Sequence, residues 1–370
     1  MVKRVPWTSW ATWETIVPLL ALVTLAVTWG EEIGPIAAVL VAIVMGGAVL
    51  AAVNHAEVVA AKVGEPFGSL VLAVAVTIIE VALIVALRSS GGNEAATLAR
   101  DTVFAAVLIT MNGIAGLSLL LGSRRYGVTL FNAEGSGAAL ATVTTLAGLS
   151  LVLPTFTTSY PGPEFSPGQL AFAAVASLVI YLLFVFTQTY RHRDFFLPVA
   201  QDGQKALVFE DDSHAEPPST RSALTSVALL LVALLAVVGL AEEESPPIER
   251  LVSAAGFPHS FVGVVIAALV LLPETLAAMR AARQGRIQTS LNLAYGSALA
   301  SIGLTIPAIA LASVWLKGPL VLGLGPLQLA LLALTVVISV LTVVPGRATR
   351  LQGELHLAVL AAYVFLSLFP

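Results

Sequence analysis

The chain has 370 residues, of which 58% are hydrophobic and only 11% are charged, and its mean hydropathy is +0.94. Soluble domains carry about 25% charged residues, so this composition excludes an ordinary globular protein, and it is the reverse of what disorder requires. The net charge of −4 gives a nucleic-acid partner no electrostatic support. The chain lacks cysteine, which excludes disulfides, thiolate metal sites and a cysteine nucleophile. The sequence therefore predicts a polytopic membrane protein.

Apolar runs between charged clusters predict the membrane spans. A transmembrane helix needs roughly 20 apolar residues, and eleven runs come near this length, two of them continuing past a single glutamate. The runs are 15–30, 33–56, 66–87, 102–123, 135–163, 165–190, 222–241, 251–279, 287–316, 318–346 and 355–370. The predicted fold class is all-α, with about eleven transmembrane helices.

The distribution of Lys and Arg predicts the orientation of these spans. If the N-terminus is cytoplasmic, fourteen basic residues fall in inner loops, and four fall in outer loops, namely Arg88, Arg100, Arg250 and Lys317. Cytoplasmic loops carry such an excess of basic residues. We therefore expect a multi-pass protein of the inner membrane, with a cytoplasmic N-terminus and the C-terminus on the opposite side. Residues 191–221, with their acidic stretch 209–218, are predicted to form a cytoplasmic linker.

The linker divides the chain into two halves that resemble each other. A leading helix (1–34) precedes a first half of five helices (35–190), and a second half of five follows the linker (222–370). A shift of 194 residues places Glu80 on Glu274 and aligns three flanking pairs: Val71 with Val265, Ala73 with Ala267, and Val76 with Val270. Because five is an odd number, the second half enters the membrane from the opposite side. Inverted repeats of this kind are typical of secondary transporters.

Glu80 and Glu274 are the two acids set deepest in otherwise apolar spans. A charge at the bilayer centre costs at least about 2.5–3.5 kcal/mol on insertion scales. Neither acid has a Lys or Arg three or four residues away, so a structural ion pair is hard to build. The two acids are therefore expected to bind a cation between them, to bind protons, or to do both.

Polar residues on neighbouring spans could complete such a site. Oxygen ligands suit Ca²⁺ and Na⁺, and Asn112, Ser301 and Thr305 could supply them. The alternatives are ordinary packing hydrogen bonds for Asn112 and Ser301, and bonding to the helix backbone for Thr77 and Thr305. Gly303 and Pro307 are expected to free backbone carbonyls at membrane depth. Without a cation, two close acids in low dielectric cannot both stay ionised and take up protons, which is the physical basis of cation/proton exchange.

Several segments resemble the Ca²⁺/cation antiporter superfamily, and specifically its bacterial ChaA-type Ca²⁺/H⁺ (Na⁺/H⁺) antiporters. The segments span nearly the whole chain and are 75–81, 99–106, 111–114, 153–159, 191–194, Pro273-Glu-Thr and Gly296-Ser. The resemblance implies one leading helix plus two inverted five-helix repeats, with ion-site segments at 66–122 and 258–315. It also implies that Glu80 and Glu274 bind the cation, helped by Asn112 and by Ser297 or Ser301.

The substrate cation stays open at this stage. The Gly-Asn-x-x-x-Glu pattern of eukaryotic vacuolar relatives is absent, because no asparagine precedes either acid, so Na⁺ or K⁺ exchange remains an alternative to Ca²⁺. No cofactor is expected besides the transported cation and H⁺, and the expected partners are inorganic cations, protons and the lipid bilayer. One alternative function is a passive cation channel with an acidic selectivity site. A scaffold or an intramembrane enzyme is a further alternative, but no catalytic grouping supports an enzyme.

Overall fold

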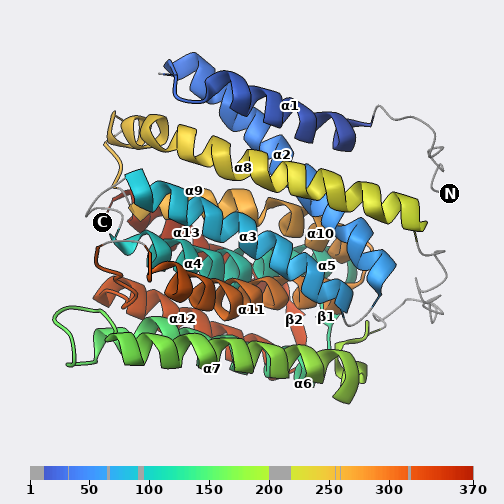
Figure 1. Ribbon diagram of the computed structural model, residues 1–370. Coiled ribbons are helices and arrows are strands. Elements are labelled where there is room, and N and C mark those ends of the chain that lie inside the picture. Colours follow the sequence, from blue (N-terminus) through green and yellow to red (C-terminus); the bar gives the residue numbers. More distant parts are fainter. Residues whose placement is uncertain are drawn as a thin grey trace. The chain divides into compact units, whose positions relative to one another are not determined.

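The computed structural model describes residues 12–31, 33–64, 67–90, 96–199, 218–254, 256–258, 260–315 and 318–369. They form helices almost throughout (Figure 1), as the apolar composition predicts. The chain divides into two compact units. The smaller comprises residues 1–79 and 217–247, and the larger comprises residues 80–216 and 248–370. These units follow a different division from the predicted repeats, whose boundaries stay a prediction. Residues 200–217 of the predicted linker lie outside the described residues.

The smaller unit contains α1 (Trp13–Thr28), α2 (Pro35–Val63), the first half of α3 (Phe67–Ser90) and most of α8 (Thr220–Ala254). A buried histidine joins three of its helices. In α2, His55 Nε2 lies 3.0 Å from the carbonyl oxygen of Glu14 in α1, and its Nδ1 lies 3.3 Å from Ser226 Oγ in α8. These two contacts give the ring polar partners inside an otherwise apolar bundle.

The larger unit holds the remaining elements. In chain order these are α4 (Leu98–Leu108), η2 (Ile109–Ile114), α5 (Ala115–Tyr126), β1 (Val128–Leu130), α6 (Ala133–Ala147), η3 (Gly148–Val152), η4 (Leu153–Thr155), α7 (Pro167–Phe186), η5 (Thr187–Arg191), η6 (Arg193–Phe196), α9 (Ser260–Val270), α10 (Leu272–Arg283), α11 (Ile287–Ala312), α12 (Pro326–Val343), β2 (Arg347–Thr349) and α13 (Arg350–Leu368). The strands β1 and β2 pair antiparallel. The segments η2, η3 and η5 are π-helical turns, whereas η4 and η6 are 3₁₀ turns.

The predicted fold class is confirmed. Among the described residues, eight helices are long and apolar enough to cross a membrane, and α9 with α10 forms a ninth span if the bent pair is counted as one. Two shorter apolar helical segments, Trp13–Thr28 and Ala73–Val85, fall in predicted runs as well. The number of crossings stays a prediction. One predicted boundary is wrong: residues 251–254 end α8, and the next helix begins at Ser260. The predicted run began after the charged residue Arg250, whereas a helix can continue past charged side chains.

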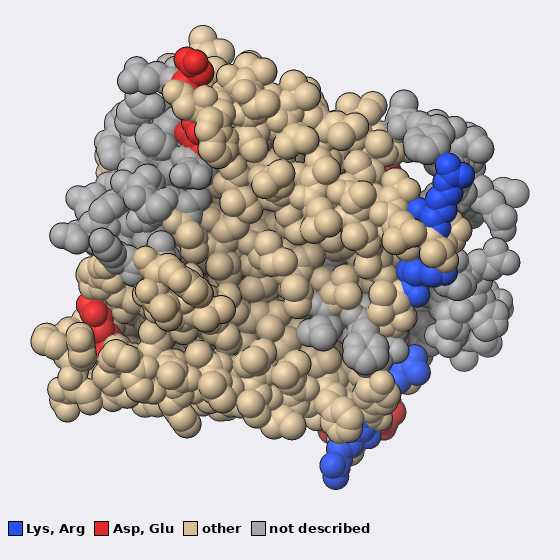
Figure 2. Space-filling model, in the orientation of Figure 1, with Lys and Arg blue, Asp and Glu red and all other residues tan. Residues whose placement is uncertain are grey.

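Loops predicted to lie on alternate sides of the membrane meet at opposite ends of the larger unit. At one end β1 pairs with β2, and Arg125 donates to the carbonyl of Arg283 at 2.7 Å. At the other end, Val321 N–H donates to Ala96 O at 3.2 Å and Gly323 N–H to Pro163 O at 2.9 Å. On the face shown in Figure 2, Lys and Arg side chains gather at one side of the view, the side of β1 and β2 in Figure 1. In this unit, successive loops therefore lie at alternate ends, as the distribution of basic residues predicted. Which of the two ends is cytoplasmic stays a prediction.

Helix irregularities occur at other places than the sequence suggested. The spans α9 and α10 meet at a 54° bend next to Leu271, one residue before the Leu272-Pro273 start of α10. The helix α11, by contrast, continues unbroken through Gly303 and Pro307. Gly303 serves close packing instead, because a Cβ at this position would lie 2.6 Å from the Cβ of Tyr181 in α7. Gly303 and Pro307 therefore do not interrupt their span, although Pro307 still lacks the N–H that would bond to the Gly303 carbonyl.

The contact between α4 and α9 depends on a missing side chain. A Cβ on Gly263 would lie 2.9 Å from both the carbonyl carbon of Asp101 and the backbone nitrogen of Thr102, and backbone atoms cannot move aside cheaply. We predict that Gly263→Ala lowers the free energy of unfolding by about 1–3 kcal/mol, the usual cost of overpacking. The measurement is thermal unfolding of the purified protein in detergent.

The matched control is Gly137→Ala in α6, where the added Cβ would meet only Val343 Cγ1 at 3.8 Å. Alanine has the higher helix propensity, so this variant should be as stable as the wild type or slightly more stable. Equal melting temperatures for the two variants would contradict the close contact of α4 with α9.

Candidate functional site

The carboxyl group of Glu80 lies at the centre of the candidate site. Glu80 comes from the middle of α3 and is 3% exposed. Ser301 Oγ donates to its Oε1 at 2.7 Å, and Thr305 Oγ1 donates to its Oε2 at 3.0 Å. Both carboxyl oxygens are therefore hydrogen-bonded, as a buried polar group requires. The structure brings together three of the predicted site residues.

The sequence of α11 explains why two hydroxyl groups meet one carboxyl group. Ser301 and Thr305 are four residues apart in a continuous helix, so their side chains lie one turn apart on the same face. The Thr305 hydroxyl donates to Glu80 across the helix pair. Of the two alternatives for Thr305, bonding to its own helix backbone is thus not the one observed. Thr77 is also buried and lies on α3 one turn before Glu80.

Glu274 occupies a different environment. It lies in the first turn of α10, directly after the bend, and is half-buried. A helix N-terminus carries a partial positive charge, which stabilises a carboxylate in the first turn. Broken spans of this kind are tolerated at membrane depth only beside protein or a water-filled cavity. The position of Glu274 is therefore one at which an ionised side chain costs less than it would in the middle of an unbroken span.

The helix α11 connects the levels of the two acids. It runs antiparallel to α10, and Ser290 Oγ donates to the carbonyl of Ala278 at 2.7 Å. Counting from this contact, Glu274 comes level with Ala294, which is seven residues before Ser301, or about 10 Å along the helix axis at 1.5 Å per residue. Helical periodicity places Ser297, which is half-buried, on the face that Ser290 and Ser301 share. Ser297 thus lies between the levels of the two carboxyl groups.

Asn112 belongs to another part of the structure. It is fully buried in η2, and its Nδ2 donates to Thr335 Oγ1 in α12 at 2.9 Å. Its Oδ1 lies 3.1 Å from Nδ1 of His356 in α13. The structure does not bring Asn112 into hydrogen-bond contact with Glu80 among the described residues. His356 was not among the predicted site residues, although a histidine in the apolar run 355–370 is a signal that points to it.

The chemistry that the arrangement offers is that of an oxygen-rich site. Around Glu80, each of the two carboxyl oxygens lies within hydrogen-bond distance of one hydroxyl oxygen. Hydroxyl groups can rotate, so they donate to a carboxylate or turn their lone pairs toward a cation. Among the described residues no three His, Asp or Glu side chains gather. A cation beside Glu80 would therefore meet one carboxylate together with neutral hydroxyl oxygen atoms.

The comparisons with known proteins identify the family of the chain. The profile of the sodium/calcium exchanger protein family matches residues 33–190 and 225–369, most of the chain. The chain belongs to the sodium/calcium exchanger family. It is 45% identical over 365 residues to y4hA of Sinorhizobium fredii (strain NBRC 101917 / NGR234), which is named as an ionic transporter. The aligned region covers 97% of this chain and 96% of that protein.

Two further proteins are similar over almost their full length. The sodium-potassium/proton antiporter ChaA of Escherichia coli (strain K12) is 34% identical over 352 residues, which is 94% of each chain. The crystal structure of the Ca²⁺/H⁺ antiporter protein YfkE matches with a TM-score of 0.67 at 14% identity, covering 96% of this chain and 99% of that one. The predicted resemblance is thereby confirmed, and the exchanger fold is shared with YfkE.

The hydrogen bonds of Glu80 should contribute measurably to stability. We expect Ser301→Ala to lower the free energy of unfolding by about 1–3 kcal/mol, because it leaves a buried carboxyl oxygen without a donor. In a Glu80→Gln background the same change should cost less, with a coupling energy of about 0.5–3 kcal/mol between the two positions. The measurement is a double-mutant cycle by unfolding in detergent.

The control cycle pairs Ser301→Ala with Thr145→Ala, which removes an exposed hydroxyl on α6 that bonds only to its own helix. These two changes should be additive within about 0.5 kcal/mol. Additivity of Ser301→Ala with Glu80→Gln would show that the contact at 2.7 Å contributes nothing to stability.

Proposed function

We propose that this protein is a secondary antiporter that exchanges a cation for protons by alternating access around Glu80 and Glu274. The observation that carries the proposal is the buried carboxyl group of Glu80, whose two oxygens accept from Ser301 and Thr305 on α11. A carboxylate in such a place needs a positive charge, either a proton on one of its oxygens or a cation beside it. The two ions compete for the same group, and this competition couples their movements.

The same three side chains serve both states in the proposed mechanism. In the protonated state, one oxygen of Glu80 carries the proton, and the hydroxyl groups of Ser301 and Thr305 share the remaining hydrogen bonds. When a cation arrives, the proton leaves, and the two hydroxyl groups rotate so that their oxygens face the cation. Glu274, at the start of α10, and Ser297, between the two levels, are the proposed further ligands. Asn112 acts from outside this group, and Thr77 is an additional candidate on α3.

Ca²⁺ is the first candidate for the exchanged cation, and Na⁺ and K⁺ are the second. Exchange of Ca²⁺ for two protons would leave a site with two carboxylates neutral in both states, and YfkE is described as a Ca²⁺/H⁺ antiporter. The 34% identical relative ChaA is described as a sodium-potassium/proton antiporter. One carboxylate together with neutral hydroxyl oxygens would also suit a monovalent cation. We place the protein in the inner membrane with its N-terminus in the cytoplasm, because of the distribution of its basic residues.

The proposal predicts coupled exchange in everted membrane vesicles. With an imposed pH gradient, addition of Ca²⁺, Na⁺ or K⁺ should move protons against the cation, as a pH-sensitive dye would report. Glu80→Gln and Glu274→Gln should abolish this exchange, because an amide can neither release a proton nor supply charge to a cation. Ser301→Ala should raise the KM for the cation by about 10-fold, as loss of a ligand or its partner does at metal sites.

The matched control is Glu134→Gln, which removes an acid of α6 beyond hydrogen-bond distance of the candidate site among the described residues; its exchange should equal that of the wild type. Cation flux that ignores the pH gradient would favour the alternative of a passive channel. Full coupled exchange by both glutamine variants would refute the proposal.

A second prediction concerns proton release at equilibrium. When the cation is added to purified protein in a lightly buffered detergent solution, the pH should fall, because the cation favours the ionised form of Glu80 and its proton enters the solution. Glu80→Gln should release fewer protons per cation bound. The measurement is titration calorimetry in two buffers of different ionisation enthalpy, and an unchanged proton count in Glu80→Gln would assign the released proton to another group.

A further inference from the structure

A second buried polar cluster lies between η2, α12 and α13. Besides the contacts of Asn112 with Thr335 and His356, His356 Nε2 lies 3.3 Å from Thr342 Oγ1 in α12. His356 is fully buried. Helical spacing places Ser339 on the face of α12 that carries Thr335 and Thr342. Its hydroxyl is buried and has no hydrogen-bond partner among the described residues, so this face offers more polar groups than the observed contacts use.

The partners of His356 determine which of its nitrogen atoms carries the proton. The Oδ1 of Asn112 can only accept a hydrogen bond, so His356 Nδ1 must donate to it. In a neutral imidazole the other nitrogen then has a lone pair, which accepts from the hydroxyl of Thr342. The side chain of Asn112 is thus fixed at both ends, its oxygen by His356 and its nitrogen by Thr335.

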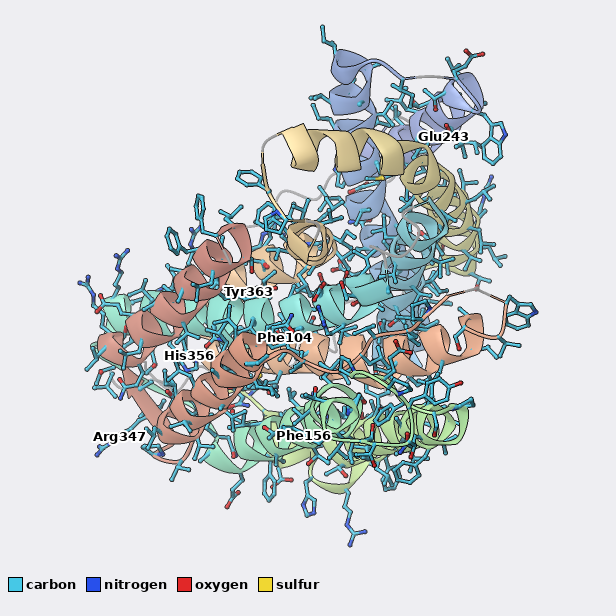
Figure 3. The ribbon with its side chains drawn as sticks, turned by 90° about the vertical axis from the view of Figure 1, so that its left-hand side faces the viewer. Phe104, Phe156, Glu243, Arg347, His356 and Tyr363 are labelled. Atoms are coloured by element: carbon cyan, nitrogen blue, oxygen red, sulfur yellow. The ribbon has the colours of Figure 1, made fainter. Side chains whose placement is uncertain are left out.

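Two glycines bring the histidine to this place. A Cβ on Gly116 would lie 3.0 Å from the Cβ of His356, and a Cβ on Gly353 would lie 2.9 Å from the carbonyl oxygen of Gly116. The backbones of α5 and α13 therefore touch one turn after Asn112. Farther along α13, Tyr363 packs edge-on against Phe104 of α4 with ring centroids 5.5 Å apart (Figure 3). The helix α13 thus contacts α4 through Tyr363 and packs against η2 and α5.

The turn that carries Asn112 is unusual and lies next to the candidate site. A π-helical turn is rare and costs more than the α-helix it interrupts, so it persists where its surroundings hold it. Thr110 Oγ1 donates to the carbonyls of Ala106 and Val107 at 2.7 and 3.0 Å, beside the wider turn. The turn packs against α11, which carries Ser301 and Thr305, and against α10, which carries Glu274. A change in the shape of η2 would therefore alter the packing of both helices.

We infer that His356 is a positioning residue for the candidate cation site: through its Nδ1–H it fixes Asn112, and through Asn112 it holds the π-helical turn 109–114 in the shape against which α10 and α11 pack. This inference rests on the proposed function for what the site binds, but not for the shape of the turn. Among the described residues His356 forms no hydrogen bond with Glu80. Its effect on exchange should appear in the apparent affinity for the cation.

Two amide substitutions separate the two ends of the imidazole ring. In His356→Asn, the new amide nitrogen takes the position of Nδ1 and can still donate to Asn112. In His356→Gln, the longer side chain carries its amide toward Thr342 and leaves Asn112 without its donor. We expect His356→Asn to keep a KM for the cation close to that of the wild type, and His356→Gln to raise it about fivefold or more, as loss of one buried hydrogen bond does. Exchange is measured in everted vesicles with Na⁺ and with Ca²⁺.

Amide hydrogen exchange of residues 109–114, followed by mass spectrometry, tests the turn without any transport assay. Amide hydrogen exchange of this turn should be faster in His356→Gln than in the wild type, and unchanged in His356→Asn. If His356→Gln does not fold, Thr335→Val takes its place, because it removes the other contact that fixes Asn112 and should have the same two effects. If the wild-type protein moves no cation, the proposed function fails, and hydrogen exchange still decides whether His356 holds the turn.

The matched control is Ser177→Ala. It removes the 2.9 Å contact between the hydroxyl groups of Ser150 and Ser177, which holds another π-helical turn, η3, against α7. Hydrogen exchange of residues 148–152 should become faster, whereas the KM for the cation should not change. The inference would be overturned if His356→Asn and His356→Gln had equal KM values and equal amide hydrogen exchange at residues 109–114. It would also be overturned if Ser177→Ala raised the KM as much as His356→Gln does.

Discussion

The carboxyl group of Glu80 sets the main constraint on this structure. It is buried in the middle of a span, and within the described residues it forms no salt bridge. Hydrogen bonds from two hydroxyl groups stabilise it instead. A buried carboxyl group tolerates this arrangement only when it binds a proton or a cation. The continuous helix α11 is needed for the same reason, because a break at Gly303 would separate the hydroxyl groups of Ser301 and Thr305.

Much of this could be predicted from the sequence, because a bilayer imposes strong rules on composition. Apolar runs must be helical where no water can bond to the backbone, and each predicted run contains a helix. The alternation of basic loops is a second strong signal, and the loops meet at the two ends of the larger unit as expected. Glu80, Ser301 and Thr305 were predictable as a group, since polar residues at such depth are costly and must find one another.

The positions that could not be predicted depend on packing between segments far apart in the chain. Gly303 and Pro307 suggested an interruption, yet the bend lies before Pro273, because neighbouring helices decide where a proline is accommodated. Asn112 was expected beside the acids. The π-helical turn adds a residue to its helix turn, and the side chain meets His356 and Thr335 instead. No periodicity in the sequence reports a π-helical turn.

The unequal surroundings of the two glutamates suggest how leakage is avoided. Glu80 is sealed by α11, whereas Glu274 is half-buried at a helix N-terminus, where ionisation costs less. In the proposed mechanism Glu274 can stay charged while it meets water, but Glu80 cannot be enclosed as an unpaired carboxylate without a penalty of several kcal/mol. The empty, ionised site is therefore the state least able to close. In the proposed mechanism only a protonated or cation-bound Glu80 can be enclosed, so each change of access would carry one ion or the other, and the coupling would follow from the desolvation of a single side chain.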